Sequence, residues 1–225
     1  MKKIILIALL LLPFYWFMSE AKTAYNFEKP IIKFQADSTV LPPKLNFDYI
    51  KSRTSKLGKK VEVDAHFCEE NNRMTKAFIT NYLSAQEIVV GDPITFDCKN
   101  SDGFCFKEYK EFETFNLFTF TYQNGYCCKT LYAVTTKKDT LAIINIGVLA
   151  FSANKSGWLG DKYGKWISED VMDMTTVSHY DDDFIEDNNN SRIDTTWSII
   201  RINKEGLLKE NIYKKVAYLE GRKIE

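Results

Sequence analysis

From residue 87 onward, short runs of β-branched and aromatic residues alternate with clusters of turn residues. Such runs are typical of strands. The connections between them are short, and consecutive strands joined by short connections run antiparallel. The pattern therefore predicts a mainly β fold, an antiparallel up-and-down meander in a curled or barrel-like sheet, with a β-sandwich as the alternative. The predicted strands are residues 87–90, 94–98, 104–109, 112–122, 126–136, 140–151, 171–180, 193–203 and 207–219.

One stretch before these strands has the periodicity of a helix. Apolar residues recur every four positions from Met74 to Tyr82, which forms one stripe of an amphipathic helix. We expect one principal α-helix at residues 71–84, with Asn71 or Asn72 as its N-cap. The stripe is expected to face the core.

Asn124-Gly125 is the strongest hairpin signal in the chain. A two-residue turn at this point would place Tyr122 opposite Cys127 and Phe120 opposite Lys129. The sequence therefore predicts a hairpin between the strands at residues 112–122 and 126–136 in that register.

The first twenty-one residues have the pattern of a secretory signal peptide. Lys2-Lys3 precedes an uncharged apolar run at residues 4–18, and Ser19-Glu20-Ala21 supplies small residues at the −3 and −1 positions of a cleavage site. The apolar run is shorter than the roughly 20 residues of a spanning helix, so we expect no permanent membrane anchor. Because no cysteine precedes Cys68, the sequence contains no lipobox. We therefore expect cleavage and export to the periplasm or the extracellular space.

Three segments follow from this interpretation: a signal peptide at residues 1–21, an extended leader at residues 22–43 and a single β-rich domain at residues 44–225. The leader ends at Pro42-Pro43, which cannot join a central strand. A hydrophobic content of 45% is sufficient for a core. Without residues 1–21 the chain keeps 28 basic and 29 acidic residues. This near-neutral balance argues against a nucleic acid as a partner.

Five cysteines in an exported chain predict disulfide bonds. Cys98 and Cys105 flank a turn that contains Asp102-Gly103, so a bond between them would join the two ends of a hairpin. We therefore expect a Cys98–Cys105 disulfide.

The remaining cysteines are Cys68 and the adjacent pair Cys127 and Cys128. Neighbouring side chains in a strand point to opposite faces, so both members of the pair cannot bond one partner. We expect one of them to bond Cys68 or to stay reduced. A bond between the two neighbours is the minor alternative, because it requires a backbone that is not a strand.

An aromatic and glycine-rich segment at residues 152–165 is predicted to be a loop that interrupts the meander. Trp158, Tyr163 and the following Trp166 are candidates for binding a sugar or a peptide, because aromatic rings stack on apolar faces. The same rings could instead pack the loop against its own sheet.

Asp181, Asp183 and Asp187 belong to an oxygen-rich segment and are weak candidates for a calcium site. No register of this segment supplies both the glycine and the glutamate that an EF-hand requires. We therefore predict no metal and no cofactor, and we expect the segment to be a solvated hairpin tip.

Catalytic motifs are missing from the sequence. His66 and Cys68 are two residues apart and could form a thiol–imidazole pair, but no third group accompanies them. We expect an exported bacterial envelope or secreted binding module without catalytic activity, whose partner is an envelope protein, a glycan or a small apolar ligand. The alternatives are a structural or assembly component of the envelope and a hydrolase that uses acidic residues or the His66/Cys68 pair.

Overall fold

The computed structural model describes residues 46–64, 68–83, 88–90, 103–125, 127–155, 157–180, 191–219 and 222–223. All of them belong to one compact unit, Asp37–Glu225. The predicted signal peptide, the predicted leader and the predicted strand at residues 94–98 lie outside the described residues. None of the helices in the described ranges is long and apolar enough to cross a bilayer.

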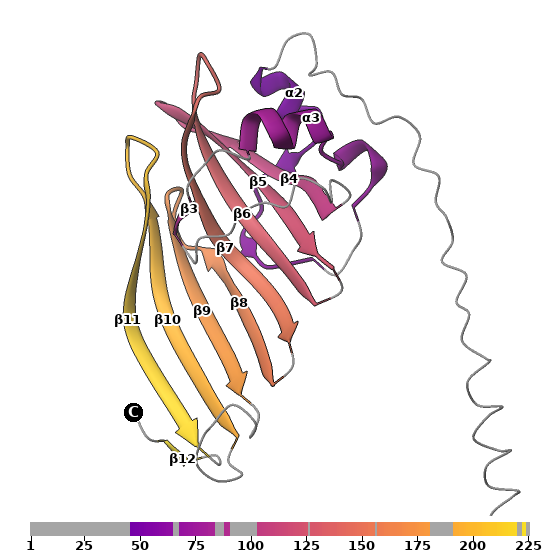
Figure 1. Ribbon diagram of the computed structural model, residues 1–225. Coiled ribbons are helices and arrows are strands. Elements are labelled where there is room, and N and C mark those ends of the chain that lie inside the picture. The colour runs from indigo at the N-terminus through magenta and orange to yellow at the C-terminus, as the bar shows by residue number, and fades with distance from the viewer. Residues whose placement is uncertain are drawn as a thin grey trace, which may run out of the picture. The chain divides into compact units, whose positions relative to one another are not determined.

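Eight long strands form an antiparallel meander in which each strand pairs with the next one along the chain (Figure 1). The sheet is not closed, since β1 and β12 stand at the two ends of its path. The predicted up-and-down β fold is therefore confirmed. The long strands are β4 (Phe104–Glu111), β5 (Phe115–Asn124), β6 (Cys128–Lys137), β7 (Ile143–Lys155), β8 (Trp158–Trp166), β9 (Val171–Tyr180), β10 (Arg192–Ile202) and β11 (Leu208–Leu219).

Four short strands extend this sheet. They are β1 (Ser55–Lys56), β2 (Lys60–Val61), β3 (Ile88–Val90) and β12 (Arg222–Lys223). Strands β1 and β3 run parallel to β4 and β7, whereas β2 and β12 run antiparallel to β8 and β11.

The helical part is shorter than predicted. Helix α3 (Lys76–Phe78) begins at Thr75, whose hydroxyl accepts the Phe78 amide at 3.2 Å, and it continues into the π-helical turn η2 (Ile79–Leu83). The predicted cap at Asn71 or Asn72 is wrong, since both residues belong to the separate 3-10 turn η1 (Glu70–Asn72). The sequence pattern also missed the short helix α2 (Phe47–Lys51), which Asn46 caps.

Helices α2 and α3 lie beside β4 and β5 (Figure 1) and cover one face of the β4–β7 part of the sheet. Phe78 is fully buried, and its ring centroid lies 5.1 Å from that of Phe106 on β4. Phe104 stacks on Tyr122 at 4.3 Å. Aromatic packing therefore dominates this first core.

Strands β7 and β8 separate along their length. They pair only between Phe151–Lys155 and Trp158–Lys162, and beyond these residues β3 takes the free edge of β7 while β2 takes that of β8. The separated parts pack on each other through a second core. Its buried members are Val61, Phe115, Leu117, Leu131, Ala133, Leu149, Ala150, Met172, Met174, Ile200, Ile202 and Leu208.

Polar contacts also hold the two packed parts of the sheet together. The Thr135 hydroxyl donates to the Gly206 carbonyl oxygen at 2.6 Å, and the Leu208 amide donates to the Asn145 side chain at 3.2 Å. Around Leu117 and Thr135, both faces of β5 and β6 are consequently covered, one by the helices and the other by the start of β11 and its neighbours.

The hairpin between β5 and β6 exists, but its predicted register is wrong. Asn124 pairs with Cys128 and Phe120 pairs with Tyr132, a shift of three residues. Strand β5 ends at Asn124 and β6 begins only at Cys128, and Gly125, directly after β5, has a φ of 63°. An odd shift exchanges the two faces of a strand, so Tyr132 rather than Lys129 joins Phe120 in the first core.

The predicted loop at residues 152–165 is also wrong, because most of this segment forms the end of β7 and strand β8. Its glycines permit close backbone approach. A Cβ atom at Gly164 would clash with the Asp173 carbonyl oxygen and with Met174 on β9. Glycine in a strand can mark such an approach as well as a loop.

Candidate functional site

A disulfide links Cys68, which follows the β2 region, to Cys105 on β4. The two Cα atoms lie 5.6 Å apart, within the usual range for this bond. The predicted Cys98–Cys105 pairing is therefore corrected, and Cys98 lies outside the described residues. The expectation that Cys68 bonds Cys127 or Cys128 is wrong as well. The segment after Cys68 runs beside β4, where the Met74 amide donates to the Phe104 carbonyl oxygen at 3.0 Å and brings Cys68 close to Cys105.

This disulfide forms part of the wall of a cleft of about 590 Å³ on the face of β4–β6 opposite the helices. One side of the cleft consists of β4, β5 and β6, and the other consists of Ser55 on β1 and the segments around β2 and η1. Its lining residues are Ser55, Lys60, Glu62, Val63, Asp64, Cys68, Glu69, Asn72, Cys105, Phe106, Lys107, Glu108, Thr121 and Leu131.

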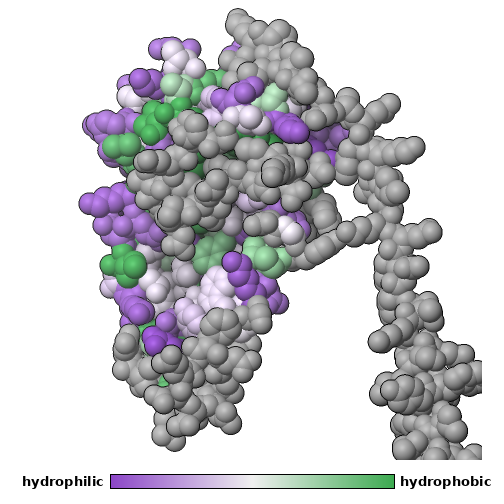
Figure 2. All heavy atoms as spheres, in the orientation of Figure 1, coloured by the Kyte–Doolittle hydropathy of each residue, from purple (hydrophilic) through white to green (hydrophobic). Residues whose placement is uncertain are grey.

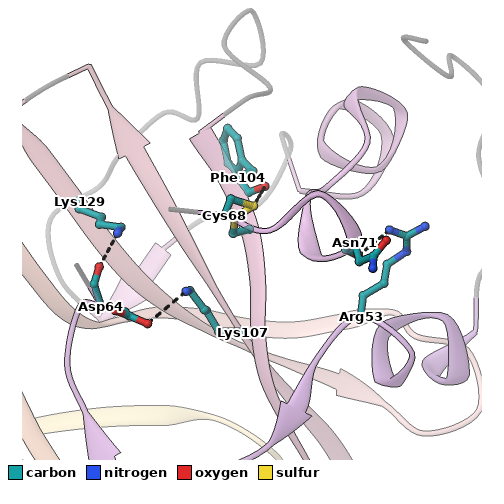
Figure 3. Close-up of a disulfide and its surroundings, with 8 residues drawn as sticks. Arg53, Asp64, Cys68, Asn71, Phe104, Lys107 and Lys129 are labelled. Atoms are coloured by element: carbon teal, nitrogen blue, oxygen red, sulfur yellow. Dashed lines mark hydrogen bonds and ion pairs between the residues drawn. A yellow bond between two sulfur atoms is a disulfide. The ribbon is translucent and has the colours of Figure 1, made fainter. Parts of the chain in front are cut away.

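Asp64 receives two lysines from the sheet (Figure 3). The Lys107 ammonium lies 3.8 Å from its carboxylate, and the Lys129 ammonium donates to its backbone carbonyl oxygen. Burial lowers the pKa of Lys129, the positive charge of Lys107 lowers it further, and Asp64 opposes both effects. The two lysines thus hold the Asp64 segment against β4 and β6.

Glu108 on β4 is another charged residue of the cleft wall. Its carboxylate accepts the Gly58 amide at 3.1 Å, which ties the chain between β1 and β2 to β4. Burial raises the pKa of Glu108, while the hydrogen bond from Gly58 and the charge of Lys107 oppose this shift. The cleft therefore has a polar and mixed-charge lining, with carboxylates more numerous than ammonium groups.

Cys127 and Cys128 bond each other. The minor alternative from the sequence is therefore the arrangement in the structure. Its physical reason is that Cys127 belongs to the turn and only Cys128 begins β6, so strand alternation does not separate the two side chains. The Cys127 carbonyl oxygen accepts the Asn154 amide at 2.8 Å, which anchors this turn to β7.

The three predicted aromatic ligand residues do not form one platform. Trp158 and Trp166 lie on the face of β8 that continues toward the second core, whereas Tyr163 lies on the opposite face and is 47% exposed. Trp158 packs over Gly160, where a Cβ atom would meet the indole ring. Trp166 lines a second hollow of about 390 Å³ beside Tyr109. Its indole nitrogen is buried and has no hydrogen-bond partner among the described residues.

Several predicted site residues lie outside the described part of the chain. They are His66, Asp181, Asp183 and Asp187. Within the described residues, no three side chains of the metal-binding types lie close enough together to hold a metal ion.

The cleft residues Asp64, Lys107 and Glu108 were missed by sequence reasoning. Val61-Glu62-Val63-Asp64 alternates apolar and acidic residues, but no local signal in the sequence identifies the two lysines that contact Asp64. Comparison with family models, with curated proteins and with solved structures finds no match to this chain.

Proposed function

We propose that the protein is an exported, non-enzymatic binding module and that the cleft beside the Cys68–Cys105 disulfide holds its ligand. The observation that carries this proposal is a cleft of about 590 Å³ whose two sides are joined by a covalent bond. Its volume is in the range of small-molecule sites, and a cross-linked wall keeps such a site formed before the ligand arrives.

The lining indicates the kind of ligand. Charged groups and hydroxyls from Ser55, Lys107 and Thr121 face the cleft, which favours a small polar ligand over an apolar one. Lys107 pairs with Asp64, and Glu108 accepts the Gly58 amide, so these groups hold the walls of the cleft. Such an arrangement suits binding better than proton transfer.

Export is supported by the cysteines. Disulfides persist in oxidising compartments and are rare in the cytosol, and the described residues contain two of them. Together with the predicted signal peptide, they favour the periplasm or the extracellular space. Mass spectrometry of the exported protein should find Lys22 as its first residue. An intact residue 1–21 segment on the exported protein would contradict this proposal.

The ligand site can be tested by thermal unfolding of the mature protein with amino acids, short peptides and mono- or disaccharides. A ligand at a hundred times its Kd stabilises the native state by about 2.7 kcal/mol, which raises the Tm measurably. We expect at least one compound to raise the Tm of the wild type. Lys107→Ala should abolish the shift, whereas the control Lys138→Ala, in the exposed β6–β7 turn, should retain it. A shift that survives in Lys107→Ala would place the ligand elsewhere.

A further inference from the structure

The outward face of β8–β10 carries a row of residues in register. Tyr163 pairs with Thr175, and Thr175 pairs with Trp197. The next residues along β9 and β10, Met174 and Ser198, are buried toward the second core. Since neighbouring side chains of a strand point to opposite faces, Tyr163, Thr175 and Trp197 point outward.

A third aromatic ring joins this face from β11. The pairing of β10 with β11 is irregular between Trp197 and Ser198, and Tyr213 is the residue that the irregularity leaves unpaired. Its hydroxyl donates to the Asp173 carboxylate on β9 at 3.1 Å. To reach β9 from β11, the ring must cross β10 near Ile199, which pairs with Asp173. The tyrosine is nevertheless 58% exposed, so it lies on the sheet and remains accessible.

Contacts fix the positions of these rings. The Lys214 ammonium lies 4.3 Å from the centroid of the Trp197 ring, a cation–π contact that restricts the indole. The hydrogen bond to Asp173 does the same for Tyr213. Preorganised rings lose little conformational freedom when a ligand stacks on them.

We propose that Tyr163, Trp197 and Tyr213 form a stacking platform for an extended, uncharged oligosaccharide. The rings of Tyr163 and Trp197 start two strand spacings apart, about 9–10 Å, so that successive rings can contact separate sugar units of one chain. Aromatic faces bind the apolar faces of sugar rings. Thr175, between the two rings, and the Asp173 carboxylate are available to hydrogen-bond the sugar hydroxyls.

Charge and polarity distinguish this ligand from a protein partner. Carboxylates and cations are interspersed on this face, from Asp161, Asp173, Lys165, Lys214, Arg201 and Lys209, so the platform does not favour a strongly charged ligand. Protein interfaces have a continuous apolar centre, whereas the polar residue Thr175 separates Tyr163 from Trp197 here. On the side of the molecule that Figure 2 shows, green hydrophobic and purple hydrophilic residues are likewise interspersed along the left edge.

The test is binding of the mature, disulfide-intact protein to an array of immobilised neutral hexasaccharides with α- and β-linkages. The hexasaccharide that is retained best is then titrated by calorimetry. We expect Tyr163→Ala and Tyr213→Ala each to weaken binding about tenfold, and Tyr213→Phe, which keeps the ring, to weaken it less than Tyr213→Ala. Leu159→Ala is the matched control, because Leu159 lies on the same face of β8 and is 41% exposed.

Both tyrosines are exposed, so the variants should keep the Tm of the wild type, and this is measured alongside. Lys107→Ala should leave hexasaccharide binding unchanged, which separates the platform from the cleft. Failure to retain any hexasaccharide would overturn the proposal, as would equal affinity in the Tyr163→Ala/Tyr213→Ala double variant. A concentration-dependent dimer that the double variant dissociates would also overturn it, in favour of an interface between two copies.

Discussion

The Lys162 ammonium lies 2.8 Å from the Glu210 carboxylate, and the lysine side chain is only 6% exposed. The pair links β8 to β11 across the inward face of the sheet, where Ser198 also donates to Glu210. Removal of one member of a buried pair leaves the other charge without compensation.

We therefore expect Glu210→Ala to lower the free energy of unfolding by about 3 kcal/mol. The double variant Lys162→Met/Glu210→Ala should regain part of this loss, because it removes the buried ammonium as well. Urea denaturation of the two single variants and the double variant measures the coupling. Strictly additive losses would show that the two side chains do not stabilise each other.

The Cys68–Cys105 bond closes a loop of 37 residues in the sequence. The chain-entropy treatment assigns about 4 kcal/mol of stabilisation to a loop of this length. The variant Cys68→Ser/Cys105→Ser should lose most of that stability. The bond between Cys127 and Cys128 closes no loop, so the variant Cys127→Ser/Cys128→Ser should lose much less. Peptide mapping without reduction should recover residues 68 and 105 in one linked fragment. A fragment linking 98 to 105 would contradict the pairing described here.

Gly164 tests the close approach of β8 and β9. We expect Gly164→Ala to destabilise the protein by about 1–3 kcal/mol, because its Cβ atom would clash with the backbone of Asp173. Gly125→Ala is the matched control, since it has a positive φ but open space around it, and should cost about 1 kcal/mol. If the two variants lost the same free energy of unfolding, β9 would be able to move away from the new Cβ atom at position 164 at no cost in stability.

Glu108 gives the cleft a pH dependence. Burial raises its pKa above the ordinary value of 4.5, so the native state holds this proton more tightly than the unfolded state does. The contribution of Glu108 to stability therefore falls as the pH rises from about 4.5 through the native pKa, and remains low above it. Glu108→Gln, which keeps an acceptor for Gly58, should be more stable than wild type at pH 7 and equal to it at pH 3. Denaturation at both pH values measures this difference.

The sequence predicted the long strands well where apolar residues alternate or run continuously. Strand β9, for example, has the same bounds as the strand predicted at residues 171–180. It failed at β8, because Gly160 and Gly164 resemble a loop when the close approach of β9 is unknown. The hairpin position could be predicted from Asn124-Gly125, but its register depends on the turn length, which the dipeptide does not determine.

The candidate site was harder to predict for a different reason. Asp64 meets Lys107 and Lys129 only after β4 and β6 have each paired with β5, so no local pattern brings them together. Cys105 has other cysteines on both sides in the sequence. The turn signal at Asp102-Gly103 favours the shorter loop, which would join Cys105 to Cys98. The backbone contacts of Met74 with β4 place Cys68 beside it instead.

The separation of β7 from β8 should give the protein an uneven pattern of amide hydrogen exchange. Around Leu117 and Thr135, the amides of β5 and β6 are covered on both faces, so their exchange should require unfolding of the whole unit. The far ends of β8–β10, around Trp158 and Tyr180, lie beyond the overlap with β5–β7 and keep partly exposed side chains. Their amides should exchange through local opening, many times faster and at free energies well below that of global unfolding.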